Sequence, residues 1–112
     1  MPDTASPLIL VLVRDLLFAS KISSAAQAAG CSLKLIRDPA KLPEEPGRML
    51  IVDLNLTGGI DAASEWKARH SGHITGFVGH TDTATIAQAQ KAGIDRILTR
   101  GQFVSMLPEL LR

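Results

Sequence analysis

The sequence is poor in the residues on which many binding surfaces and covalent frameworks depend. Its 112 residues include one cysteine, no tyrosine and only 4% aromatic residues. A single thiol, Cys31, excludes an internal disulfide and a cysteine-based zinc cluster, and we expect it to lie in the core. So few rings exclude the base-stacking surface of a single-strand nucleic-acid binder.

The sequence also lacks an excess of charge and a long apolar run. Twelve Lys and Arg residues stand against eleven Asp and Glu residues, and both signs are scattered along the chain. This balance argues against a nucleic-acid or anionic-membrane partner. The longest strongly apolar run, residues 8–13, is far shorter than the roughly 20 residues that cross a bilayer, and Arg14 ends it too early for a secretory signal. We therefore expect a cytoplasmic protein.

Short apolar runs alternate with alanine-rich stretches of helical period along the whole chain. The runs predict strands over residues 8–13, 31–36, 49–54, 74–78 and 94–98. The helical stretches cover residues 15–29, about 60–69, 82–92 and 102–111. Gly30 and Gly93 are expected helix ends, and Asp15 and either Thr81 or Asp82 are candidate N-caps. Three prolines in residues 37–47 leave room for only a short second helix.

This alternation predicts a doubly wound α/β domain, because strands that are joined through helices lie parallel and right-handed crossovers cover both faces of the sheet. Five strands fit the flavodoxin-like order 2-1-3-4-5, whose functional crevice lies at the carboxyl ends of the first and third strands. The expected domain covers residues 8–112 and follows a loose tail over residues 1–7.

Two stretches resemble a known family. The sequence IVDLNLTG, residues 51–58, is similar to the strand and loop that carry the phosphoacceptor aspartate of response-regulator receiver (CheY-like) domains. The sequence AGIDRILTR, residues 92–100, is similar to the segment that leads to the family's conserved lysine. The resemblance extends from Leu8 to Leu111 and implies that Asp53 takes the phosphoacceptor position.

Several positions depart from the pattern of that family. Arg14 replaces the first of two acidic residues that follow the first strand, and Val78 replaces the hydroxyl residue at the end of the fourth strand. Arg100 stands in the place of the lysine, and Gly101 follows it where the family has proline. Ile97 takes the place of the usual switch aromatic. The chain thus resembles an atypical, degenerate receiver, a pseudo-receiver.

The departures change the charge of the site. Three carboxylates and one lysine give the family's site a net charge of −2, whereas Asp15, Asp53, Arg14 and Arg100 sum to zero. We therefore expect no bound metal or other cofactor, and we expect the guanidinium of Arg14 to pair with Asp53 or Asp15. If Mg²⁺ binds at all, its ligands come from Asp15, Asp53 and Asn55.

Simpler interpretations stay open for several residues. Asp15 can be only a helix cap, and Arg14 and Arg100 can be solvated charges at strand ends. His70 and His73 flank a predicted loop at the opposite edge of the sheet, where solvated histidines are the expected outcome. His80 lies at the correct edge, but no nucleophile and third partner accompany it as a catalytic triad requires.

The predicted function is a receiver-like signalling module that needs no phosphorylation and binds another protein, and the question of an enzymatic activity stays open. The alternatives are a genuine receiver that is modified on Asp53 and, third, a small-ligand-binding flavodoxin-like domain. In receiver domains the output surface usually lies on the segments that correspond to residues 83–105, and residues 37–48 are the rival surface. The candidate contact residues there are Gln88, Lys91, Arg96 and Gln102.

Overall fold

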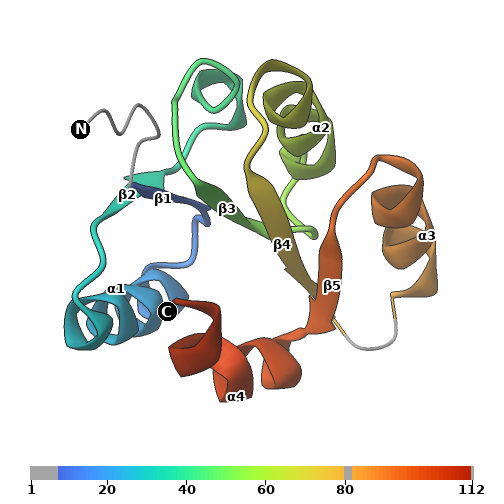
Figure 1. Ribbon diagram of the computed structural model, residues 1–112. Helices are drawn as coiled ribbons and strands as arrows, with labels where there is room; N and C mark the ends of the chain where they lie inside the picture. The colour runs from blue at the N-terminus through green and yellow to red at the C-terminus, as the bar shows by residue number, and fades with distance from the viewer. Residues whose placement is uncertain (1–7, 80–81, 112) are drawn as a thin grey trace.

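The computed structural model describes residues 8–79 and 82–111. Five strands and four α-helices alternate along the chain, with one short 3-10 helix after the second strand (Figure 1). In order, the elements are β1 (Ile9–Leu12), α1 (Leu16–Ala29), β2 (Leu33–Ile36), η1 (Pro39–Lys41), β3 (Met49–Asp53), α2 (Gly59–Arg69), β4 (His73–Val78), α3 (Thr83–Lys91), β5 (Arg96–Thr99) and α4 (Arg100–Leu110). The proposed tail over residues 1–7, the candidate cap Thr81 and His80 lie outside the described residues.

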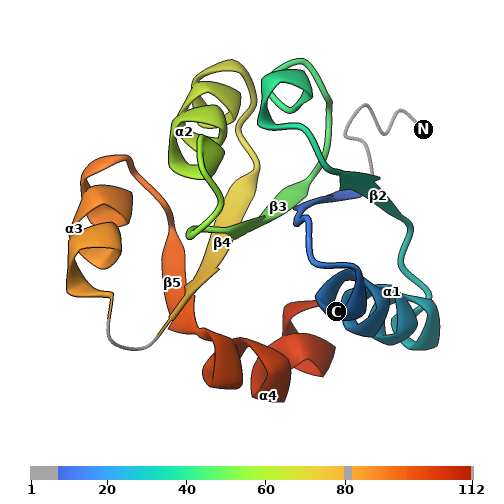
Figure 2. The ribbon, with the colours of Figure 1, turned by 180° about the vertical axis from the view of Figure 1, so that it is seen from behind.

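The five strands form one parallel sheet in the order β2-β1-β3-β4-β5, which confirms the predicted fold class. Helices α1 and α4 cover one face of the sheet, and η1, α2 and α3 cover the other (Figures 1 and 2). Each face has its own apolar core, because alternate residues of a strand point to opposite faces. Leu50 and Val52 belong to the core under α2 and α3, while Met49 and Ile51 belong to the core under α1 and α4.

The predicted helix ends are largely confirmed. Asp15 caps α1, and Gly30 ends that helix in the left-handed region at φ 73°. Asp82 caps α3, and Gly93 follows that helix at φ 87°. The prediction that the last helix starts at Gln102 is wrong by two residues, because Thr99 and Gln102 form a capping box that starts α4 at Arg100.

The second helix is reduced to η1, as the prolines predict, and the chain after η1 is held by α2. The indole N–H of Trp66 donates to the carbonyl oxygen of Glu45 at 2.7 Å, and Nε2 of His70 lies 3.0 Å from the carbonyl oxygen of Pro43. Trp66 is fully buried. A segment without regular structure is therefore fixed by a core residue.

The structure also shows where Cys31 lies and whether a described helix could span a membrane. Cys31 is half-buried at the edge of the core under α1 and α4, and its thiol donates to the carbonyl oxygen of Leu111 at 2.7 Å. None of the described helices has the length and apolar character that crossing a bilayer requires.

The tight turn from β3 into α2 gives a first prediction. A Cβ atom added at Gly59 would lie 2.9 Å from the carbonyl oxygen of Asp53. A Cβ atom added at Gly101, which is also in a helix, would have no other heavy atom within 4 Å. We expect Gly59→Ala to lower the free energy of unfolding by about 1–3 kcal/mol, because the backbone must shift. Gly101→Ala is the matched control and is expected to raise it by about 0.5–1 kcal/mol. Denaturant unfolding measures both, and equal effects contradict the prediction.

Candidate functional site

The carboxylate of Asp53 lies at the carboxyl end of β3, where the crevice of this fold is expected. Asp53 is only 8% exposed, and both of its carboxylate oxygens are bonded. Oδ1 accepts a hydrogen bond from the backbone N–H of Asn55 at 2.9 Å. Oδ2 accepts one from the guanidinium of Arg100 at 3.4 Å, and the two side chains form an ion pair. The buried charge is therefore compensated by groups of the chain itself.

Arg100 is held in place by aromatic rings. Its guanidinium carbon lies 5.2 Å from the ring centroid of Phe18 and 5.4 Å from that of Phe77, distances that are typical of cation–π contacts. The two rings pack against each other with centroids 4.6 Å apart, and Phe103 stacks on Phe77 at 4.8 Å. Three of the few aromatic residues thus form the support on which the ion pair rests.

The predicted pairing of Arg14 with Asp53 or Asp15 is wrong. Among the ion pairs of the described residues, none includes Arg14, and its side chain is exposed. The strand register explains this: Leu12 is paired with Val52, so Val13 lies level with Asp53 and Arg14 lies one residue beyond it. Of the two arginines, Arg100 is the counter-ion.

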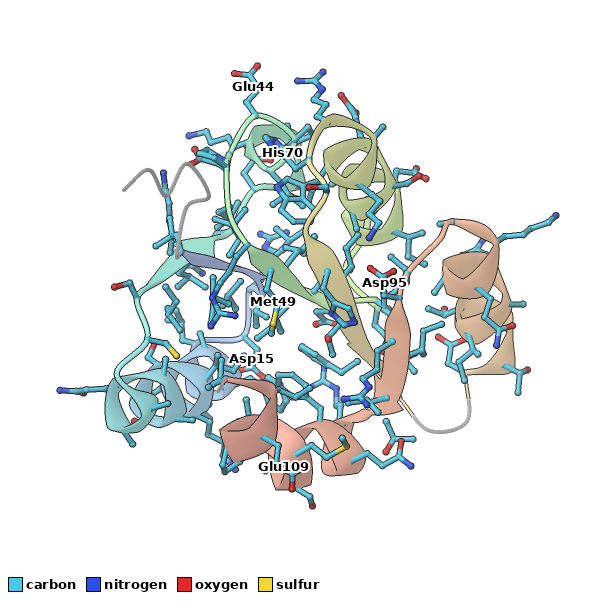
Figure 3. All side chains as sticks on the ribbon, viewed as in Figure 1. Asp15, Glu44, Met49, His70, Asp95 and Glu109 are labelled. Carbon is cyan, nitrogen blue, oxygen red and sulfur yellow. The ribbon has the colours of Figure 1, made fainter. Side chains whose placement is uncertain are left out.

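Asp15 has the local role that the simpler interpretation gave it. Its Oδ1 accepts hydrogen bonds from the backbone N–H groups of Leu17 at 3.0 Å and Phe18 at 3.3 Å, which caps α1. Figure 3 shows Asp15 on the side of the sheet that α1 and α4 cover, and His70 on the opposite side beside α2.

A polar network beside Asp53 was not foreseen from the sequence. The side chain of Asn55 donates from Nδ2 to Oδ2 of Asp82 at 2.8 Å and accepts at Oδ1 from the backbone N–H of Gly79 at 3.0 Å. Asp82 also accepts from the backbone N–H and the hydroxyl of Thr85, at 3.1 and 2.6 Å. The hydrogen bonds from Thr85 hold the pKa of Asp82 below its usual value, and Asn55 adds to this lowering. The residues that bond are 27 positions apart, so no local pattern indicates the contact.

The fold of the chain is similar to that of solved receiver domains. The chain superimposes on a response regulator of Burkholderia pseudomallei with a TM-score of 0.78 and 20% identity, over 96% of this chain and 67% of that one. It also superimposes on the BeF3-activated receiver domain of DrrB from Thermotoga maritima, with a TM-score of 0.79 and 17% identity, over 95% and 94% of the two chains. A CheY-like receiver domain of Methanospirillum hungatei gives a TM-score of 0.76 at 15% identity, over 96% and 94%. The chain has the receiver fold. No protein-family model and no curated protein sequence matches it.

The resemblance implies that receiver domains bind Mg²⁺, and the three expected ligands, Asp15, Asp53 and Asn55, all have hydrogen bonds within the chain. Among the described residues no group of three His, Cys, Asp or Glu side chains is placed to hold a metal. Asp15 already caps α1, and both oxygens of Asp53 are bonded. The side-chain oxygen of Asn55 already accepts a hydrogen bond from the backbone N–H of Gly79.

The other departures from the receiver pattern are also visible in the fold. Val78 ends β4 and is 1% exposed, so an apolar side chain occupies the expected hydroxyl position. Ile97 is half-buried and packs against the core under α2 and α3. Neither side chain has a polar group with which to order a phosphoryl group.

The two described histidines lie away from the crevice. His70 follows α2, and Nδ1 of His73, at the start of β4, lies 3.4 Å from the hydroxyl of Thr75. Burial near His73 raises the pKa of Asp95. Hydrogen bonds from Lys67 and from the N–H of Ile74 lower it, as do the charges of Lys67 and His73. The lowering effects are the larger, so the pKa of Asp95 lies below its usual value. This cluster ties α2 to the first residues of β4 and is structural.

The four predicted partner contacts are exposed, but the structure does not bring them together. Gln88 and Lys91 line a groove of about 570 Å³ between the loop after β3 and α3. Arg96 alternates with Ile97 along β5 and so lies on the α4 side of the sheet. The side chain of Gln102 is bonded to the backbone N–H of Thr99 at 3.0 Å.

The ion pair gives a second prediction. We expect Arg100→Ala to lower the free energy of unfolding by about 1 kcal/mol, because a partly exposed pair and its cation–π contacts are lost together. Arg14→Ala is the control and is expected to stay within about 0.5 kcal/mol of the wild type. With Asp53→Asn already present, Arg100→Ala should cost less. Equal losses for the two arginine variants in denaturant unfolding contradict the assignment.

Proposed function

We propose that the chain is a receiver-like signalling module that acts by binding another protein and does not need phosphorylation of Asp53. The receiver fold supports a signalling role of this class. The observation that carries the finer proposal is the occupied carboxylate of Asp53, with Arg100 on one oxygen and the N–H of Asn55 on the other.

The chemistry of phosphoryl transfer explains why this observation matters. The reaction depends on an accessible, positioned nucleophile and on cations that neutralise the oxygens of the transferred group. Asp53 is buried and already paired, and no group of three His, Cys, Asp or Glu side chains in the described part of the chain is placed to hold a metal. Arg100 supplies a positive charge, but its guanidinium already forms an ion pair with Asp53 itself.

The alternative is a genuine receiver that is phosphorylated on Asp53. The similar structure from Burkholderia pseudomallei contains a phosphorylated aspartic acid, and Asp53 ends β3 at the crevice of the same fold. In that case Arg100 has to leave Asp53 and turn to the phosphoryl group, with Asp15, Asp53 and Asn55 as the ligands of Mg²⁺.

Acetyl phosphate with Mg²⁺, followed by measurement of the intact mass, tests the two functions. We expect no phosphoryl adduct on the wild type or on Asp53→Asn. A double variant, Arg14→Asp with Arg100→Lys, restores the residue types of the receiver pattern at two of the departing positions, and an adduct on it alone attributes the block to these two positions. A stoichiometric adduct on the wild type that Asp53→Asn abolishes supports the alternative and contradicts the proposal.

We place the partner surface on α3, β5 and the start of α4. Helix α3 buries only Ala89 among its nine residues and stands at the outer edge of the molecule beside β5 (Figure 1). Its exposed Gln88 and Lys91 are free to contact another protein along the groove. A helix that buries so little apolar area is among the more easily repositioned elements of a fold.

Amide hydrogen exchange tests this surface with a purified partner. We expect binding to protect residues 83–105, because the contacts cover α3 and its neighbours. Protection that is confined to residues 37–48, the proline-rich segment around η1, would place the interface near the other edge strand and would contradict the assignment.

A further inference from the structure

Asn55 stands between the Asp53 crevice and α3 and bonds to both. Its backbone N–H donates to Oδ1 of Asp53 at 2.9 Å. Its side chain reaches away from Asp53 to the next loop, where it accepts from the N–H of Gly79 and donates to Oδ2 of Asp82. One residue therefore connects the carboxyl end of β3 to both described ends of the loop that follows β4.

The carboxylate that Asn55 contacts is also the cap of α3. Oδ1 of Asp82 accepts from the backbone N–H of Thr85, and Oδ2 accepts from the hydroxyl of Thr85 and from Asn55. The hydrogen bond from Asn55 is charge-assisted, because a neutral amide donates to an ionised carboxylate, and such bonds are stronger than neutral ones. The lowered pKa of Asp82 keeps this carboxylate ionised at neutral pH.

Few other contacts fix the position of α3. Ala89 is the one fully buried residue of the helix, and Ile86 packs against the core only in part. A groove rather than a packed interface separates α3 from the loop after β3, and Asn55 and Asp82 both line it. The bond between these two side chains crosses from one wall of the groove to the other.

We propose that Asn55 is a positioning residue that couples the Asp53 crevice to α3 and fixes that helix in one place. This inference deepens the proposed function, because it names the contact that sets the α3 surface in a module that is not switched by phosphate. The side-chain amide of Asn55 bonds to the loop that follows β4, whereas Val78 has no polar side-chain group with which to do so. The width of the groove beside Gln88 and Lys91 then depends on the Asn55–Asp82 bond.

Asn55→Asp tests the proposal with little change of shape. The substitution replaces the donor by an oxygen and places a second negative charge against Asp82, so the bond becomes a repulsion. Gln27→Glu makes the same chemical change on an exposed side chain of α1, outside the groove and the proposed partner surface, and is the matched control. Both proteins are measured in metal-free buffer, because a new carboxylate beside Asp53 and Asp82 is itself a possible cation ligand.

Amide exchange of residues 82–91 is the readout. We expect Asn55→Asp to raise the exchange rates of these amides by about tenfold or more, with β1 and β3 unchanged, while Gln27→Glu matches the wild type. Asn55→Ala, which removes the bonds without adding charge, should act in the same direction with a smaller effect. If the exchange of α3 in Asn55→Asp equals that in Gln27→Glu, the proposed coupling is wrong.

A second variant separates the specific bond from general damage. Asn55→Asp combined with Asp82→Asn reverses donor and acceptor, and asparagine remains a good helix cap. We expect exchange rates of α3 within about threefold of the wild type in this double variant. Failure to recover contradicts the proposal. Phosphorylation of the wild type by acetyl phosphate overturns the proposed function instead, without bearing on the Asn55–Asp82 bond.

Discussion

The crevice of this protein is organised around one requirement, that the buried carboxylate of Asp53 must have a cationic partner. An ionised carboxylate at 8% exposure is costly without compensation. Arg100 meets this requirement because a guanidinium is planar, always charged and able to lie over aromatic faces. Phe18 from α1 and Phe77 from β4 provide those faces, so the ion pair ties together β3, β4, α1 and α4.

The consequences for function follow from the same pair. Arg100 donates to one carboxylate oxygen of Asp53 and the N–H of Asn55 donates to the other, so a metal or a phosphoryl donor has to compete with both groups. Asp15 caps α1 through one of its carboxylate oxygens. We propose that these contacts hold the loops of the crevice in place, in a module that presents a surface to a partner.

Much of this fold could be predicted from the sequence, because strong local signals specify it. The continuous apolar runs around Leu10 and Ile51 indicate buried parallel strands, and Asp15 and Gly30 mark the ends of α1 through their own side-chain and backbone preferences. Resemblance to receiver domains singled out Asp53 correctly as the residue at the end of β3. These features depend on residues close in the sequence or on a pattern that is shared along the whole chain.

The partners of Asp53 and Asp82 could not be predicted in this way, because strand register and loop packing decide them. Arg14 and Arg100 both follow strand ends, and only the pairing of Leu12 with Val52 shows that Val13, not Arg14, lies level with Asp53. The bond between Asn55 and Asp82 joins two loops on adjacent strands, and neither loop contains a motif for it.

The central claim is that Asp53 is closed to metal by a counter-ion within the chain. Titration of the ¹⁵N-labelled protein with Mg²⁺ to millimolar concentrations, followed by the amide resonances of Asp15, Asp53 and Asn55, tests this most directly. The account predicts only small, non-saturating shifts that are spread over the surface. Saturable shifts centred on these three amides would contradict it.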